Sequence, residues 1–228
     1  MSPVRKYTFQ VKAALTLPEQ TIFERLNSPR KVQDYLDNFP INFEVSGGTY
    51  MSPRRVLREK MAHCFEAALF AAAASAYHGR KPLLMDLKTI SGDPEGDHVV
   101  ALFKEHGLWG AISKTNHAVL RYRDPVYRSV RELAMSYFHE YTTEQGRKSM
   151  RSFSEPFDLS TYPAEKWLTA GKELFWLVEA LDSSRHFPAA PNLALRKLRK
   201  ATEFERAVLG RTEWQSSKEP RRRFRKTP

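Results

Sequence analysis

The stretch AHCFEAALFAAAASAYHG, residues 62–79, decides the fold of this chain. Ala, Leu and Phe fill it on nearly every side, and a helix that is apolar all round is buried at the centre of a protein. Gly79 ends the pattern, as glycine commonly ends helices. Cys64, the only cysteine among 228 residues, stands near its start. We therefore expect a central buried helix that carries the one thiol of the chain.

The position of Cys64 within this helix has two interpretations. Ser52-Pro53 has the form of an N-cap followed by proline at the first helical position, which predicts a helix over PRRVLREKMAH. If that helix runs unbroken from Pro53 to Tyr77, Cys64 lies mid-helix. If the chain breaks around Lys60–His63, Cys64 begins a new helix whose positive end favours the thiolate. No glycine or proline marks a break, so both alternatives stand.

Three apolar segments follow the helix: PLLMDLKTI (82–90), HVVALF (98–103) and LWGAI (108–112). The first is typical of a buried strand entered through a proline. The other two are joined by KEHG and predict a tight antiparallel hairpin. SGDPEGD, residues 91–97, has the composition of a surface loop. A helix followed by consecutive strands that pack on it indicates an α+β fold.

The flanking segments complete a single domain over 1–210, with its core at about 55–124. Alternation over residues 5–16 predicts a strand, and residues 144–160 are expected to be extended. Helical patterns are expected over 18–26, 30–39, 129–141, 164–183 and 193–210, the fourth weakened by Gly171 and the last basic and amphipathic. Residues 211–228 are expected to form a basic, disordered tail.

The net charge of +11 is partly local to the C-terminus. Residues 218–228, KEPRRRFRKTP, hold six Lys or Arg and one Glu, and so contribute +5 of it. Such a tail is either simply solvated or touches nucleic acid, anionic lipid or an acidic partner. Contacts of this kind with nucleic acid would be non-specific and sensitive to salt.

Composition also bears on the compartment and on cofactors. No apolar run approaches the ~20 residues that span a bilayer, and the first twenty residues lack the apolar core of a signal peptide. One cysteine cannot form an intrachain disulfide, so we expect a cytoplasmic protein. The seven histidines are scattered, and neither an HExxH metal motif nor a phosphate-binding glycine motif is present. We therefore expect neither a metal nor a cofactor.

Three polar positions around the central helix have the chemistry of a catalytic site. Cys64 supplies a thiol, His98 opens the strand that follows a loop, and the next strand returns to the polar cluster Ser113-Lys114-Thr115-Asn116. A thiol, an imidazole and a polar group that orients the imidazole make a nucleophile, a base and an orienter. The alternative is that Cys64 is a small apolar residue of the core and His98 is structural.

The order of these elements resembles the transglutaminase-like superfamily, a papain-type thiol fold with the order Cys, His, Asp. The resemblance covers about residues 55–124 and rests on HCFEAALFAAA, LLMDL, DHVVALF and LWGAISKTN. The sequence on either side of this core, from NFPINFE to ELAMSYF, is similar to uncharacterised bacterial peptidase-like proteins of that type. The resemblance implies that Cys64 is the nucleophile and His98 the general base.

The third member of the triad is where the sequence departs from that family. In the family a Trp commonly precedes the Asp by four residues, and counting from Trp109 leads to Ser113. Asn116 is our first choice as the orienter, and Ser113 is the second; Asp124 is more distant. Asp97 is expected to point to the opposite face of the strand. His63 either lowers the thiol pKa or is a surface imidazole.

Two functions from different classes follow. The first is a cysteine hydrolase that attacks a peptide or carboxamide carbonyl, with the Cys64 backbone amide helping to hold the oxyanion and with water, or less simply an amine, as acyl acceptor. The second is a non-catalytic scaffold of the same fold, whose basic C-terminal helix and tail bind nucleic acid or an acidic partner.

Overall fold

The computed structural model describes residues 2–45, 47–90 and 96–215. Within them it is an α+β fold in which helices pack against one antiparallel sheet. The sheet has seven strands, β1 to β7, in the order β4-β3-β2-β1-β5-β7, and β6 pairs with β1 beside β5. The strands are β1 (Leu83–Lys88), β2 (His98–Glu105), β3 (Leu108–Ile112), β4 (Arg123–Tyr127), β5 (Ser152–Ser154), β6 (Phe157–Asp158) and β7 (His186–Pro188).

The predicted hairpin and buried strand form the centre of the sheet. β2 and β3 pair through Phe103 and Gly110, and β1 pairs with β2 on its other side. The turn between β2 and β3 places His106 and Gly107 at positive φ, which suits glycine and allows the tight reversal. Of the expected loop 91–97, residues 91–95 lie outside the described part of the chain.

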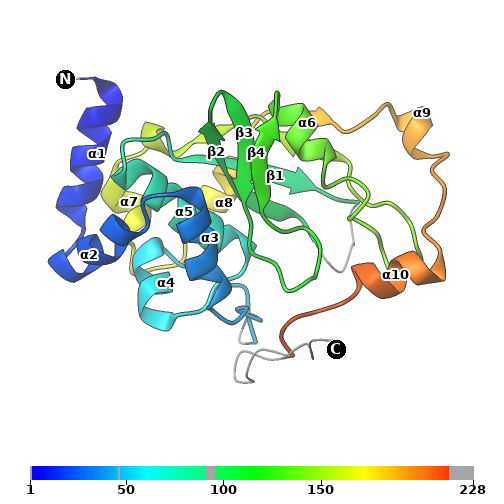
Figure 1. Cartoon of the computed structure of the whole chain (residues 1–228), viewed down its shortest axis with the longest axis horizontal. Helices are drawn as coiled ribbons and strands as arrows, with labels where there is room; N and C mark the ends of the chain where they lie inside the picture. The colour runs from blue at the N-terminus through cyan, green and yellow to red at the C-terminus, as the bar shows by residue number, and fades with distance from the viewer. Residues whose placement is uncertain (1, 46, 91–95, 216–228) are drawn as a thin grey trace.

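α5 (Cys64–Tyr77) is the buried central helix that the sequence predicts. Every residue after Cys64 in this helix is buried, and it packs on one face of the sheet. The other helices on this face are α1 (Pro3–Ala14), α2 (Leu17–Arg25), α3 (Pro29–Asp37), α4 (Pro53–Glu59), α7 (Ala164–Leu168) and α8 (Phe175–Asp182), gathered around α5 in Figure 1. They make a helical layer whose buried, inner side is apolar.

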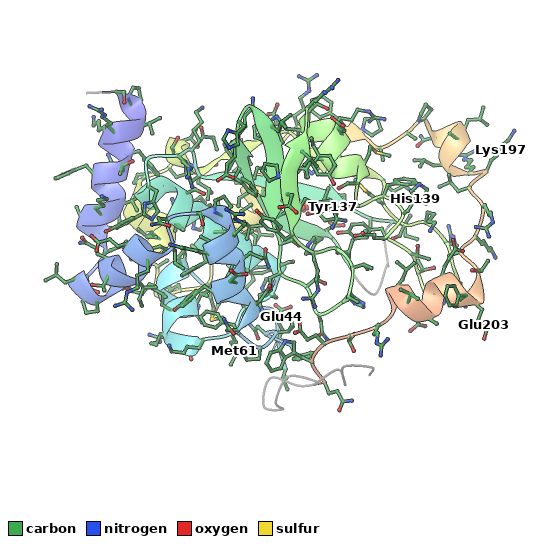
Figure 2. All side chains as sticks on the ribbon, in the orientation of Figure 1. Glu44, Met61, Tyr137, His139, Lys197 and Glu203 are labelled. Atoms are coloured by element: carbon green, nitrogen blue, oxygen red, sulfur yellow. The ribbon has the colours of Figure 1, made fainter. Side chains whose placement is uncertain are left out.

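The opposite face of the sheet carries a second, smaller core. α6 (Val130–Met135) and the turns that follow it cover Met85, Val100 and Leu102 with Leu133 and Tyr137. Figure 1 shows α6 on the far side of the strands from α5, and Figure 2 labels Tyr137 there. α9 (Asn192–Leu195) and α10 (Glu203–Leu209) extend from this face, at the right of Figure 1.

The prediction of a strand at residues 5–16 is wrong, because α1 occupies Pro3–Ala14. Ser2 caps its first turn and Pro3 stands where a helix tolerates proline. Tyr7 and Val11, four residues apart, are its buried positions. The same residues therefore satisfy a helical spacing, and the burial of Tyr7 and Val11 against the helical layer decides for the helix.

Two long predicted helices are broken in the structure. The segment 164–183 forms α7 and α8, and Gly171 lies in the break between them. The basic segment 193–210 forms α9 and α10, so no continuous basic helix exists there. Thr202 caps α10 with Glu205, which starts a new helix instead of continuing the old one. Likewise, the segment 129–141 is helical only as α6, and turns follow it.

The first residues of the expected tail pack against the domain. Trp214 is buried, and the backbones of Thr212 and His117 form an isolated bridge. Arg121 donates a charge-assisted hydrogen bond to Glu213 at 2.8 Å. The expectation of a disordered tail from residue 211 is therefore wrong for residues 211–215, since Trp214 anchors them; residues 216–228 lie outside the described part.

Within the described ranges, the helices are all too short or too polar to cross a lipid bilayer.

Candidate active site

The chain breaks before Cys64, as the second of the two sequence alternatives has it. α4 ends at Glu59, Lys60 adopts the left-handed conformation with φ 53°, and α5 begins at Cys64 with His63 as its N-cap. The C-cap of α4 is Lys60 and not a glycine or a proline, so the sequence carries no local signal for this break. Cys64 therefore lies in the first turn, where amides lack intrahelical partners and the helix end is positive.

His63 is the N-cap of α5 and not a surface imidazole. Its Nδ1 accepts from the Phe65 N–H at 3.3 Å and its Nε2 lies 2.6 Å from the Thr49 carbonyl oxygen. Its side chain is only 14% exposed. The Cys64 Sγ lies 4.0 Å from the same Nδ1. Nδ1 can accept from Phe65 only while it is unprotonated; once protonated, it gives up that bond and its N–H is available to the sulfur, so protonation of His63 and ionisation of Cys64 favour each other.

Glu66 ties the surrounding loop to this helix end. Its fully buried carboxylate accepts hydrogen bonds from the backbone N–H groups of His63 and Met51, both at 3.0 Å. The Thr49 hydroxyl donates to it as well, at 3.0 Å. Thr49 is also the residue whose carbonyl holds the His63 ring. Figure 2 labels Met61 and Glu44 beside this helix end, and the Glu44 carboxylate lies 3.7 Å from His63 Nε2.

The thiol of Cys64 is tuned towards the thiolate. Burial alone would raise its pKa, but hydrogen bonds from His63 and His98, together with the charges of both rings, hold the pKa well below its ordinary value. Burial alone would lower the pKa of His63, but the neighbouring sulfur and the Glu66 carboxylate raise it to about 9. A half-buried cysteine with a depressed pKa is the property of a reactive thiol.

His98 opens β2 and reaches both Cys64 and Ser113. Its Nε2 lies 2.8 Å from the Ser113 Oγ, and the Ser113 hydroxyl donates onward to the Leu120 carbonyl oxygen. Ser113 Oγ therefore accepts from Nε2–H, and Nδ1 is the nitrogen left for the thiol. This chain of donors fixes one tautomer of the imidazole. The structure brings Cys64, His98 and Ser113 together.

Gln33 fixes the backbone at Ser113. This glutamine of α3 is buried, and its side-chain amide makes one hydrogen bond to the Ser113 carbonyl and one to the Ser113 amide. The next residue, Lys114, is also buried and donates from Nζ to the Leu36 and Phe39 carbonyls at 2.9 and 2.7 Å. α3 therefore holds the segment that presents the Ser113 hydroxyl.

Asn116 takes part in a different contact. Its side-chain amide donates to the Trp214 carbonyl at 3.0 Å and accepts from the Trp214 N–H at 2.8 Å. Both halves of the amide thereby hold the C-terminal segment. Asn116 was our first choice as the orienter of His98, but it is Ser113 that bonds the imidazole.

The two carboxylates near the site lie apart from the imidazole. Asp97 accepts from the Thr89 N–H at 2.8 Å and from the Thr89 hydroxyl at 3.2 Å. Asp124 is exposed on β4. The imidazole is therefore paired with a neutral hydroxyl.

The sequence pattern did not identify Gln33 and Glu66 as residues of the site, and it did not identify His63 as the N-cap of the helix. Glu66 stands three residues after His63, the spacing of a capping box. Histidine is an unusual N-cap, so the pattern was hidden. Gln33 lies eighty residues before Ser113, and only the fold brings them together.

A group of carboxylates elsewhere has a spacing that a metal ion could use. Oxygen atoms of Asp86, Asp97 and Asp182 lie within 4.8 Å of one another. Asp182 pairs with Lys88 at 2.8 Å, and Asp86 with His186 at 3.1 Å. These partners serve two of the three carboxylates, Asp97 accepts from Thr89, and no further observation in the described part of the chain points to a cation there.

Comparison with known proteins adds no family to this geometry: no protein-family model matches the sequence, and none of the curated proteins matches it significantly.

Proposed function

We propose that this protein is a cysteine hydrolase of the transglutaminase-like type, which cleaves a peptide or carboxamide bond through an acyl-enzyme on Cys64. The observation that carries the proposal is the placement of the thiol in the first turn of α5, with its Sγ 4.0 Å from His63 Nδ1 and with His98 near enough to help lower its pKa. The chain order of α5, of β2, which begins with His98, and of β3, which Ser113 follows, supports the resemblance to the transglutaminase-like fold. The chemistry needs no cofactor, and because a reduced thiol is required we place it in the cytoplasm.

Acylation begins with the thiol proton. His98 takes it through Nδ1, and the thiolate adds to the substrate carbonyl carbon. The charge that develops on the carbonyl oxygen is met by the Cys64 backbone N–H, a first-turn amide with no intrahelical acceptor. The C–N bond then breaks, and His98 returns the proton to the leaving amine. The product is a thioester on Cys64.

Deacylation repeats these steps with water. His98 removes a proton from a water molecule, whose oxygen adds to the thioester carbonyl. The C–S bond breaks, the carboxylic acid leaves, and the sulfur recovers its proton from His98. Ser113 keeps the imidazole in one tautomer throughout. As a neutral orienter it stabilises the imidazolium less than a carboxylate would, so we expect modest rates.

The test is capture of the acyl-enzyme. Wild-type protein is incubated with a panel of peptidyl thioesters and amides, quenched in acid and analysed by intact mass and peptide mapping. We expect an acyl mass on Cys64 in the wild type, its absence in Cys64→Ala, and its persistence in a His98→Ala variant given an activated thioester. Acylation elsewhere, or none across the panel, would contradict the proposal.

A cationic cleft favours a second candidate function, binding of nucleic acid. A cleft of about 490 Å³ beside α9 is lined by Arg147, Lys148, Arg151, Asn192, Leu195, Arg196, Leu198 and Lys200, with no acidic residue among them. Figure 2 labels Lys197 on this part of the chain. Burial and the charge of Arg147 lower the pKa of Arg151. The side chains of Arg147, Arg196 and Lys200 make neither a hydrogen bond nor an ion pair within the described part, so they are available to phosphates.

Charge-matched variants separate this cleft from general basicity. One variant replaces Arg147, Arg196 and Lys200 by alanine, and the control replaces Arg25, Lys166 and Lys172, which are exposed elsewhere. Affinity for a fluorescent DNA duplex is measured against salt. We expect only the cleft variant to bind the duplex more weakly. Its affinity should also depend less steeply on salt, because about one to three fewer counterions are released on binding. Equal effects of both variants, or no binding by the wild type at low salt, would refute this function.

A further inference from the structure

An apolar groove lies between α10 and the turns that follow α6. Its volume is about 650 Å³, within the range of ~300–1,000 Å³ that is ordinary for ligand sites. His139 contributes to it from the turns, and Figure 2 labels this residue together with Glu203, the neighbour of Phe204. The apolar lining comes from Leu198, Phe204, Val208 and Leu209. The groove is therefore suited to a ligand with an apolar face.

Large apolar side chains of this groove are exposed to solvent. Phe204 is 80% exposed and Val208 is 47% exposed. The two residues are four positions apart and therefore lie on the same face of α10. No residue of α10 is buried. The apolar face of this helix is thus uncovered among the residues that the structure describes, with an aromatic ring at its most exposed point.

The start of α10 is tied to the turn at 143–146. The Ala201 N–H donates to the Gly146 carbonyl oxygen at 2.8 Å, and Thr202 caps the helix together with Glu205. Gly146 has a φ of 81°, and a Cβ there would lie 2.7 Å from the Ala201 carbonyl oxygen. Glycine is what allows the two segments to approach this closely. Phe204 is therefore presented by a helix whose position is fixed.

The apolar groove adjoins the cationic cleft beside α9. Lys148 and Leu198 line both of them. The cleft contributes the side chains of Arg147, Arg196 and Lys200, which have no ion-pair partner in the described part of the chain. Positive charge that is available to a ligand therefore lies next to an exposed aromatic ring.

The acidic residues that line the groove are already paired with cations. The Glu140 carboxylate lies 2.6 Å from the Arg123 guanidinium, and the Glu205 carboxylate lies 3.5 Å from that of Arg199. Their negative charges are therefore balanced locally and oppose an anionic ligand only weakly.

We propose that the apolar groove and the cationic cleft together bind single-stranded nucleic acid, with a base stacked on Phe204 and the adjoining phosphates on Arg147, Arg196 and Lys200. The inference rests on the second candidate function, nucleic-acid binding by the cleft, and names the form of nucleic acid that is bound. Proteins that bind single strands combine a basic groove with aromatic side chains in this way, and every base has a face that can stack. We therefore expect little sequence preference.

Other polyanions match the charge but not the groove. In a duplex the bases are stacked on one another, so a ring beside the backbone reaches none of their faces. A lipid surface is flat, whereas Phe204 and Val208 line a concave groove. An acidic peptide carries carboxylates without a flat ring beside each of them. A single strand repeats a ring and a phosphate in every unit, which is the pairing that the groove and the cleft offer.

The test compares probes that share a phosphate backbone and differ in their bases. The full-length protein is titrated with a fluorescent oligothymidylate, with an abasic strand of equal length and with the oligothymidylate–oligoadenylate duplex. We expect the oligothymidylate to bind about tenfold more tightly than the abasic strand, the effect of one stacked base. Phe204→Ala should remove this advantage and leave the affinities for the abasic strand and the duplex unchanged. The salt dependence should also stay the same, because no phosphate contact is lost.

Further variants separate stacking from apolar contact and from folding. Phe204→Trp keeps an aromatic face and should keep the affinity for oligothymidylate, whereas Phe204→Leu keeps only the apolar character and should lose most of the advantage. Phe9→Ala is the matched control, since Phe9 is 69% exposed on α1. It should leave all three affinities unchanged. Because Phe204 is largely exposed, its variants should melt at the temperature of the wild type.

The inference and the function on which it rests fail separately. Equal affinity of the wild type for oligothymidylate and the abasic strand, or an unchanged affinity for oligothymidylate in Phe204→Ala, would overturn the inference and leave the cationic cleft in place. Polyglutamate and phosphatidylglycerol vesicles are titrated alongside. If Phe204→Ala weakened binding of either as much as that of oligothymidylate, the groove would belong to an acidic peptide or a lipid surface, which also overturns the inference. Absence of nucleic-acid binding at low salt would refute both.

Discussion

The side chain of Gln33 holds the backbone of Ser113 from both sides: Nε2 donates to the Ser113 carbonyl at 2.9 Å, and the Ser113 N–H donates to Oε1 at 3.0 Å. Through this pair the N-terminal helical layer positions the hydroxyl that orients His98. Gln33, which lies outside the segment 55–124 that resembles the transglutaminase-like family, therefore helps to build the candidate site.

Gln33→Ala should slow Cys64 alkylation at neutral pH about tenfold. Loss of the two hydrogen bonds frees the Ser113 segment, and about 1.4 kcal/mol of lost orientation corresponds to one factor of ten. Gln20→Ala is the matched control, since Gln20 donates to two backbone carbonyls away from the site. The rate is measured with iodoacetamide on folded protein. Equal rates of Cys64 alkylation in the two variants would show that Gln33 does not position Ser113.

Ser113→Ala and Asn116→Ala distinguish the two candidate orienters. Ser113 bonds the imidazole, so its loss should lower the alkylation rate at neutral pH about tenfold. It also leaves the buried imidazole N–H and the Leu120 carbonyl without their partner, so the free energy of unfolding should fall by about 1–3 kcal/mol. Asn116 bonds Trp214 instead, so its loss should release the C-terminal segment and leave the alkylation rate unchanged. Protease accessibility near Trp214 reports the second effect. The reverse pattern would restore Asn116 as the orienter.

Gly110→Ala should destabilise the sheet by about 1–3 kcal/mol. A Cβ at this position would clash with the Phe103 ring and lie 2.7 Å from the Arg123 carbonyl oxygen, which is backbone and has little freedom to move. Gly171→Ala is the control, because nothing lies within 4 Å of its added Cβ. Urea unfolding of both variants gives the difference. Similar free energies of unfolding would show that β3 and β4 are more loosely joined.

His186→Gln should flatten the pH dependence of stability above about pH 6.5. The Asp86 hydrogen bond raises the pKa of His186 above its ordinary value of 6.5, although burial opposes this. A raised folded pKa gives a stabilisation that is full below about 6.5 and is lost as the pH rises through the folded value. The free energy of unfolding of the wild type should therefore fall with pH more steeply than that of the variant. Parallel curves would mean that the pair contributes nothing.

The sequence predicted what depends on local pattern. The apolar run after Cys64 predicts a buried helix, which is α5. The apolar segments that become β2 and β3, joined by the short KEHG turn, predict the antiparallel hairpin. The α+β class followed from their order and is confirmed. Cys64 and His98 could be named as candidates because a single cysteine on an apolar helix and a histidine at the start of a strand can be recognised in the sequence.

The remaining features depend on contacts that local pattern does not contain. α1 alternates like a strand, but burial of Tyr7 and Val11 against the helical layer decides for a helix. The choice between Ser113 and Asn116 depends on which strand end reaches the imidazole, and Trp214 takes up the Asn116 amide from ninety-eight residues away. The break before Cys64 is made by a left-handed Lys60, a residue that carries no turn signal.

The measurement that tests the central claim most directly is the rate of Cys64 alkylation against pH in wild type, His98→Ala and His63→Ala. The account predicts a fast plateau that extends below neutrality in the wild type, because both imidazoles hold the thiol pKa down. Each variant should move the midpoint upward, and the double variant should approach the ordinary ~8.5. A slow rate that rises only near pH 8 to 9 in all of them would contradict the account and make Cys64 a residue of the core.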